Sequence, residues 1–248
     1  QGNDHLIYEM GAQLAKQARR LGMHINFAPV ADVNNNPNNP VISFRSFGEN
    51  KYKVAEKAVA HMKGMQDHGL LTSAKHFPGH GDTGVDSHYD LPVINKTFES
   101  IDSLELYPFK ELIKNGLSGV MIAHLSIPAL DNTPHLPSTL SKPIVTDLLK
   151  TKLGFEGLIY SDAMNMKGLT KHFSDGRGDA MGLEAGMDIL EFTEDVNKSI
   201  AEIKKSIATG RITQADIDAR CRKVLEAKAW AGLNQYKPIE LNNLYEDL

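Results

Sequence analysis

The sequence predicts an α/β fold of the (β/α)8 TIM-type barrel class, and three observations favour it. Short apolar segments alternate with helical segments along most of the 248 residues. The apolar segments are continuous, which is typical of strands that are buried on both faces of a parallel sheet. Polar residues follow each of them, as they do at the carboxyl ends of barrel strands. A doubly wound sheet would look similar, but no glycine-rich nucleotide fingerprint is present in the sequence.

The first half of the chain opens with a helix and then alternates. Apolar residues recur at spacings of three and four, at Leu6, Ile7, Met10, Leu14, Ala18 and Leu21. We expect Asp4 to cap this helix and Gly22 to end it in the left-handed conformation. A buried strand over 24–30 follows, and then a helix over 52–68 and a strand over 70–75.

The second half continues the pattern to the end of the chain. Its predicted elements are a helix at 99–115, a strand at 119–124, a helix at 142–152, a strand at 157–162, a helix at 178–186, a short strand at 187–190 and two closing helices. Thr213 and Asp216 form a variant capping box at the start of the last helix.

The number of strands predicts an incomplete barrel. Only about five strands are found where a closed barrel has eight. The chain does not begin with Met and opens directly into a helix, so we expect a piece of a longer protein that lacks the N-terminal strands. The expected division is a partial barrel over 1–235 and a C-terminal tail or linker over 236–248.

Composition excludes several function classes. The formal net charge is -4 and the basic residues form no cluster, so we expect no nucleic-acid partner. No apolar run approaches the ~20 residues that span a bilayer. Cys221 is the only cysteine, which rules out an internal disulfide, and we interpret it as a packing residue of a helix.

The densest cluster of ionisable residues is the segment over 75–88, Lys-His-Phe-Pro-Gly-His-Gly-Asp-Thr-Gly-Val-Asp-Ser-His. Its proline and glycines predict a loop after a strand. Two interpretations stay open. One is a metal site, with the candidate ligands His76, His80, Asp82, Asp86 and His88. The other is acid/base catalysis, in which Asp86 orients the imidazole of His88 and raises its pKa.

Three further residues are candidates by position. Asp162 ends a predicted buried strand, where a carboxylate serves equally well as a helix cap or as a nucleophile. Arg45 lies among aromatic residues in Val-Ile-Ser-Phe-Arg-Ser-Phe and is suited to bind hydroxyl or carboxylate groups. His124 also ends a strand, and its position alone favours a structural, hydrogen-bonded histidine.

Together these motifs resemble the β-N-acetylglucosaminidase branch of the family-three glycoside hydrolases. The resemblance rests on Lys-His-Phe-Pro-Gly-His-Gly at 75–81 with Asp-Ser-His at 86–88, and on four other landmarks in order. These landmarks are Asn-Phe-Ala-Pro-Val-Ala-Asp at 26–32, Arg-Ser-Phe at 45–47, Met-Ile-Ala-His at 121–124 and Ser-Asp at 161–162. The resemblance extends from about residue 5 to 190 and is specific, because the β-glucosidase members of the family lack the Asp-Ser-His element.

The resemblance implies a retaining, double-displacement hydrolysis of terminal β-linked N-acetylglucosamine. It makes Asp162 the nucleophile and makes His88, held by Asp86, the acid/base. Arg45, Lys75 and His76 match sugar-binding residues. The expected substrate-binding set is completed by Asp32, His124 and Met166. No metal and no cofactor is implied.

The resemblance also sets expectations about context. The carbohydrate substrate would be a peptidoglycan fragment or a chitooligosaccharide, and a phosphorylase is a variant of the same chemistry. Longer relatives carry a second domain, and the compartment stays open between the bacterial cytoplasm, through peptidoglycan recycling, and the periplasm. Two alternatives remain: a truncated sugar-binding fragment without turnover, because relatives carry an acidic sugar-binding residue N-terminal to this chain, and a metal-dependent hydrolase built on the histidine-rich loop.

Overall fold

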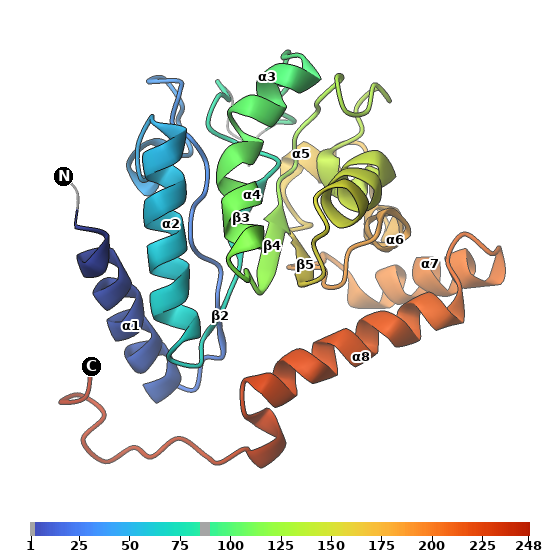
Figure 1. The fold of residues 1–248 in the computed structure, drawn as a ribbon. Coiled ribbons are helices and arrows are strands. Elements are labelled where there is room, and N and C mark those ends of the chain that lie inside the picture. The colour runs from blue at the N-terminus through green and yellow to red at the C-terminus, as the bar shows by residue number, and fades with distance from the viewer. Residues whose placement is uncertain (1–2, 85–89) are drawn as a thin grey trace.

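A computed structural model describes residues 3–84 and 90–248 (Figure 1). The first half contains α1 (Asp4–Arg20), β1 (Ile25–Asn26), α2 (Lys51–Gln66), β2 (Leu71–Thr72), β3 (Ala74–Phe77), α3 (Phe98–Ser103) and α4 (Leu106–Lys114). The second half contains β4 (Gly119–Ile122), the helix η3 (Pro143–Lys152), β5 (Leu158–Ser161), α5 (Lys167–Thr170), α6 (Arg177–Ala185), α7 (Val196–Ala208) and α8 (Gln214–Trp230). Strands and helices alternate, so the predicted α/β class is confirmed.

The strands pair in parallel and form an open arc. β1 pairs with β2, and β3, β4 and β5 pair in that order. Single bridges extend the arc at both ends, from Val30 to Lys75 and from Tyr160 to Ile189. All carboxyl ends of a parallel arc lie on one side, where barrel enzymes place their chemistry. The described residues do not close this arc into a complete barrel, as the low strand count predicts.

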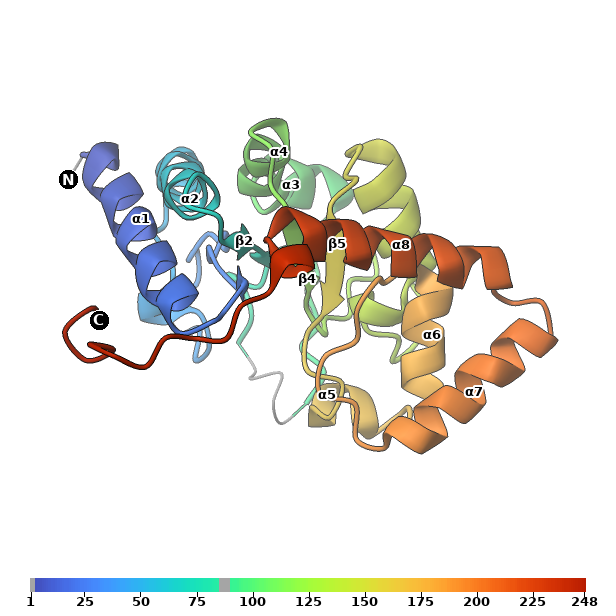
Figure 2. The ribbon, with the colours of Figure 1, turned by 90° about the horizontal axis from the view of Figure 1, so that it is seen from below.

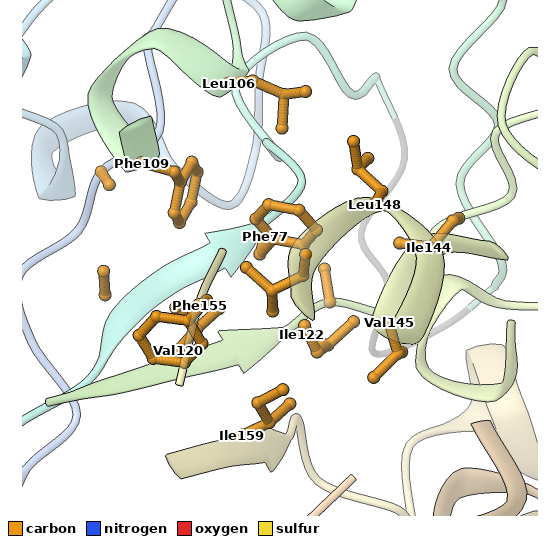
Figure 3. Packing of buried hydrophobic residues seen from close by; sticks show 14 of the residues in the cluster. Phe77, Leu106, Phe109, Val120, Ile122, Ile144, Val145, Leu148, Phe155 and Ile159 are labelled. Carbon is orange, nitrogen blue, oxygen red and sulfur yellow. The ribbon is translucent and has the colours of Figure 1, made fainter. Parts of the chain in front are cut away.

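The main core lies between the arc and the helices outside it (Figure 3). Phe77, Val120, Ile122 and Ile159 project from β3, β4 and β5 toward α4 and η3. The rings of Phe77 and Phe109 meet edge to face, with their centroids 5.2 Å apart. Burial of each such large side chain contributes about 1.5–3 kcal/mol. This packing fixes the strands whose carboxyl ends carry the polar side chains described below.

α1 and α2 lie side by side (Figure 1) and pack through small residues. A Cβ at Gly11 would lie 2.4 Å from the carbonyl oxygen of His61, and one at Gly64 would lie 2.1 Å from that of Tyr8. The two backbones therefore touch, and only glycine fits at the crossing. The larger residues of the periodic stripe, Leu6, Met10 and Leu14, are exposed. The predicted helix is confirmed, and its small-residue face makes the contact with α2.

α8 and the residues after it pass beneath the arc (Figure 2). Val224 and Ala227 of α8 pack on the cluster formed by Met121, Leu158 and Tyr160. The Lys223 ammonium donates to the buried Asp188 carboxylate at 2.7 Å. Residues 236–248 contain no helix or strand and run to α1, where the Arg20 guanidinium binds the Asp247 carboxylate at 2.7 Å.

Several predicted elements differ in detail, two of them because proline has no N–H to donate. The strand expected at 24–30 is reduced to β1, because Pro29 interrupts the ladder. The helix expected at 99–115 divides into α3 and α4, because Pro108 cannot donate to Leu104. The strand expected at 70–75 is split into β2 and β3, and that at 187–190 is a single bridge.

Other expectations about single residues are corrected or confirmed. Asn3, rather than Asp4, accepts the capping bond at the start of α1. Cys221 is exposed, so its interpretation as a packing residue is wrong. Gly22 is left-handed with φ +76°, and the Thr213–Asp216 capping box is present, as predicted.

Candidate active site

Polar side chains gather at the carboxyl side of the arc around a pocket of about 200 Å³. Its lining contains two cationic and two carboxylate side chains, two imidazoles, and apolar residues on the inner face of the strands. These residues are Phe27, Val41, Arg45, Lys75, His76, His80, Met121, Asp162, Ala163, Glu191 and Phe192. The sequence-predicted residues Arg45, Lys75, His76 and Asp162 are thus brought together from segments far apart in the chain.

Asp32 lies beneath the pocket, completely buried, and anchors both imidazole residues. Its Oδ2 is 2.7 Å from Nδ1 of His76, and its Oδ1 accepts from the backbone N–H of His80 at 2.7 Å. Burial alone would raise the pKa of this carboxyl. The attraction of His76 and the hydrogen bonds from His76 and His80 outweigh burial and hold the pKa below its ordinary value. Asp32 therefore remains an anion that orients the two histidines.

The loop that carries His80 is held close to the Asp32 segment. A Cβ at Gly81 would lie 1.7 Å from the carbonyl oxygen of Val33, so only glycine permits this approach. The amide of the buried Asn39 donates to the carbonyl oxygens of His80 and Gly81 at 2.8 and 2.9 Å. Backbone contacts thus fix the His-Gly pair of the motif in place.

Asp162 follows β5 directly and points into the pocket. Its backbone N–H donates to the carbonyl oxygen of Ile122 at 2.9 Å, and its Oδ1 accepts from the N–H of Ala163 at 2.8 Å. Burial raises the pKa of Asp162, but the His76 and His124 imidazoles and the Ala163 N–H lower it further, to below its ordinary value. The carboxylate is therefore ionised near neutral pH and accessible from the pocket.

Two cations face this carboxylate. Burial and the neighbouring Arg45 guanidinium lower the pKa of Lys75, while Asp162 and Asp32 act in the opposite direction. Nη2 of Arg45 lies 3.3 Å from Nε2 of His76. The Arg45 segment is attached to the Asp32 segment because the Ser46 hydroxyl donates to the Asp32 carbonyl oxygen at 2.6 Å. The pocket thus offers fixed hydrogen-bond donors next to an anionic oxygen.

His124 and Met166 both contact the carbonyl oxygen of Ala163, the residue that follows Asp162. His124 is completely buried, with Nε2 3.0 Å from the carbonyl oxygen of Ala163 and Nδ1 2.7 Å from the Thr139 hydroxyl. It therefore holds the backbone that follows Asp162. Met166 is buried at the start of α5. The pocket lining contains neither of these two side chains, and Asp86 and His88 lie outside the described residues.

Seven lining residues were not predicted from the sequence as catalytic or substrate-binding: Phe27, Val41, His80, Met121, Ala163, Glu191 and Phe192. His80 was weighed only as a metal ligand. Glu191 follows the predicted strand at 187–190 directly, and polar residues after strands were the signal used for Asp162. The same rule would therefore have found Glu191. The apolar residues Phe27 and Met121 carry no such signal in the sequence.

The described residues contain neither a cluster of metal ligands nor a membrane-spanning helix. Within residues 3–84 and 90–248, no three His, Cys, Asp or Glu side chains are placed to hold a metal ion. Over the same ranges, no helix combines the length and the apolar character needed to cross a bilayer.

The fold and the pocket define a (β/α)-barrel domain with a polar site at the carboxyl ends of its strands. Residues 1–227 match the glycosyl hydrolase family 3 N-terminal domain, and the chain belongs to this family. It is 34% identical over 239 residues to β-hexosaminidase A of Pseudoalteromonas piscicida, covering 89% of this chain and 40% of that protein. It is 36% identical over 186 residues to a β-hexosaminidase of Nitrosospira multiformis, covering 75% of this chain and 52% of that protein.

Solved structures are similar over nearly the whole chain. A family 3 β-N-acetylglucosaminidase from Paenibacillus sp. strain FPU-7 superposes with a TM-score of 0.91 at 36% identity. The superposition covers 97% of this chain and 46% of the Paenibacillus chain. The chain thus spans about half the length of the relatives that it matches, and the resemblance found in its motifs is confirmed at the level of the family.

Proposed function

We propose that the chain carries the catalytic site of a retaining β-N-acetylglucosaminidase, which hydrolyses terminal β-linked N-acetylglucosamine. The observation that carries this proposal is the Asp162 carboxylate, which is held ionised in the pocket opposite Arg45 and Lys75. The carboxylate oxygen can attack the anomeric carbon of a sugar, and the neighbouring Arg45 and Lys75 can donate hydrogen bonds to its hydroxyl groups. The β-hexosaminidase and β-N-acetylglucosaminidase relatives support the choice of sugar.

In the proposed reaction, an Asp162 oxygen attacks the anomeric carbon while the glycosidic C–O bond breaks. His88, oriented by Asp86, donates its proton to the leaving oxygen. It then removes a proton from the water that hydrolyses the glycosyl–enzyme ester, so the configuration is retained. The motif resemblance in the sequence supports the roles of Asp86 and His88. A histidine adds no negative charge beside the anionic nucleophile.

The other residues divide into sugar-binding and positioning groups. We assign Arg45, Lys75 and His76 to hydrogen bonds with the sugar, because they line the pocket around Asp162. Asp32 acts through His76, since it is completely buried beneath that side chain. We assign His124 and Met166 to positioning, because the His124 imidazole and the Met166 backbone N–H both contact the Ala163 carbonyl oxygen.

The substrate in the proposal follows the family resemblance of the sequence motifs. Terminal N-acetylglucosamine of peptidoglycan fragments or chitooligosaccharides is the proposed substrate. We further propose that residues 1–235 form the barrel domain and that 236–248 form a tail or linker, with a second domain in the whole protein. The relatives' greater length supports this division.

The test is hydrolysis of 4-nitrophenyl β-N-acetylglucosaminide in chelator, with and without phosphate, by the wild type and by the His88→Ala variant. We expect turnover that chelator and phosphate leave unchanged and that His88→Ala slows by about 10²–10⁴-fold. Added azide should restore part of the rate of His88→Ala at the second step, because this anion needs no base. Strict phosphate dependence would identify a phosphorylase, and inhibition by chelator would identify a metal-dependent enzyme.

A further inference from the structure

The segment Glu191–Phe192 is bound on both sides of Asp162. The N–H of Glu191 donates to the Ser161 hydroxyl at 2.9 Å, and the carbonyl oxygen of Glu191 accepts from the N–H of Met164 at 2.8 Å. Ser161 and Met164 flank Asp162 in the sequence. The position of Glu191 and Phe192 relative to the reactive carboxylate is therefore fixed by direct hydrogen bonds.

Phe192 holds a conformation that is unfavourable for the free chain. Its φ is +49°, a left-handed value that bulky residues rarely adopt, and its side chain is 74% exposed although it is apolar. The backbone hydrogen bonds of Glu191 hold the chain in place on the N-terminal side of Phe192. On the other side, the hydroxyl of Thr193 lies 2.7 Å from that of Ser199 in α7. Strained backbone conformations that the surrounding structure holds in place are typical of functional sites.

The Phe192 ring is part of the pocket wall. It lines the same pocket as Asp162 while most of its surface stays accessible, so it lies at the mouth of the pocket rather than at the bottom. An exposed aromatic ring here gains nothing from the protein core. It offers a flat apolar surface to whatever projects from the pocket, and pyranose rings present a matching face of C–H groups.

Glu191 adds a polar group to this wall. Its carboxyl and that of Asp162 are the two carboxyl groups in the described lining, whereas Arg45 and Lys75 are hydrogen-bond donors. Burial raises the pKa of the Glu191 carboxyl, which is the opposite direction from Asp162. A carboxylate oxygen accepts hydrogen bonds from the hydroxyl groups of a sugar, which the cations cannot do.

We propose that Glu191 and Phe192 form a subsite for the leaving-group sugar. The Phe192 ring packs on the C–H face of that sugar, and the Glu191 carboxylate accepts hydrogen bonds from its hydroxyl groups. This inference rests on the proposed function and deepens it, because it states that the preferred substrate has a saccharide, rather than a small alcohol, on the reducing side of the cleaved bond. It makes these two residues determinants of specificity.

The test compares N,N′-diacetylchitobiose with methyl β-N-acetylglucosaminide, which has no leaving-group sugar. We expect Phe192→Ala to lower kcat/KM for chitobiose by about tenfold, mainly through KM, and to leave the methyl glycoside within about twofold. Phe192→Tyr should retain activity on chitobiose, and Glu191→Gln should show the same selective loss as Phe192→Ala. Tyr245→Ala, at an aromatic residue of the tail that is also mostly exposed, is the control.

A binding measurement separates this inference from the proposed function. Calorimetry with chitobiose on Asp162→Asn should give a dissociation constant that Phe192→Ala weakens by about tenfold, whether or not the wild type turns over. No turnover by the wild type, with this difference intact, would contradict the proposed function alone. Equal losses on both glycosides, or unchanged affinity for chitobiose, would overturn the subsite.

Discussion

Two pockets at different places in the molecule show what distinguishes a reactive site. The larger, about 490 Å³, lies between the end of α1 and the C-terminal tail, and the smaller, about 200 Å³, lies at the carboxyl ends of the strands. In the larger pocket the arginines bind backbone oxygens of the tail region, such as Arg19 to Ala231 at 2.7 Å. In the smaller pocket the charges lie against buried partners, and the pKa values of Asp162 and Lys75 are displaced.

The carboxylates of the two regions differ in how far they are removed from water: Asp32 beneath the smaller pocket is completely buried, whereas Asp247 in the larger pocket is half exposed. A solvent-exposed ion pair contributes little to folding stability. A buried charge, in contrast, needs fixed partners, and these partners set its pKa and its reactivity. Choosing the pocket of larger volume would therefore place the active site in the wrong region of the molecule. Substitutions in the two regions should therefore differ in their effects.

The largest effect is expected at Asp162. Asp162→Asn removes the nucleophile while keeping its shape, so turnover of the 4-nitrophenyl glycoside should fall by about 10³-fold or more. The variant should still unfold cooperatively on heating, which excludes loss of the fold as the cause of the lost turnover. Retained turnover in this variant would show that another group attacks the sugar.

The next effect concerns stability. Asp32→Ala leaves the His76 ring and the His80 N–H without their buried acceptor and should cost about 3–5 kcal/mol of unfolding free energy. Asp247→Ala in the other pocket should cost below about 1 kcal/mol, because the carboxylate that it removes is half exposed. Urea unfolding of both variants, with Asp32→Asn as a milder companion, measures the contrast. Equal costs would contradict the distinction between the pockets.

A smaller effect is expected in the pH dependence of stability. The folded-state pKa values of Asp32 and Asp162 lie below the ordinary value of 3.8. The stability that these two carboxylates contribute to the fold is therefore fully present above pH 3.8, and it is lost as the pH falls through their folded-state pKa values. Unfolding free energies from about pH 6 to about pH 3 should decline more steeply for the wild type than for Asp32→Asn. Parallel curves would show that Asp32 is not held as an anion.

The smallest effect is expected at the strained residue. Phe192→Gly relieves a left-handed conformation and removes a ring that is mostly exposed, so it should raise the thermal midpoint by about 2–4 °C. The same variant should weaken turnover of chitobiose, which separates stability from function. A lowered midpoint would indicate that the ring packs on the protein.

The sequence predicted the strand–helix alternation and four of the pocket residues, because periodicity and polar strand ends are local signals. It missed the interruptions at Pro29 and Pro108, although a proline, which has no N–H to donate, is itself a local signal for a break in a strand or helix. Asp32 and His124 matched the family pattern, but their burial beneath the pocket depends on tertiary packing. Phe192 carried no sequence signal at all, since its role arises from a backbone conformation.

The central claim is that Asp162 forms a covalent bond with the sugar. The most direct measurement is mass spectrometry of the protein after incubation with 5-fluoro-N-acetylglucosaminyl fluoride, which forms the intermediate faster than water can release it. We predict one added sugar per chain, located by peptide mapping on Asp162 and absent from Asp162→Asn. A label on another residue, or complete turnover of the reagent without any label, would contradict the account.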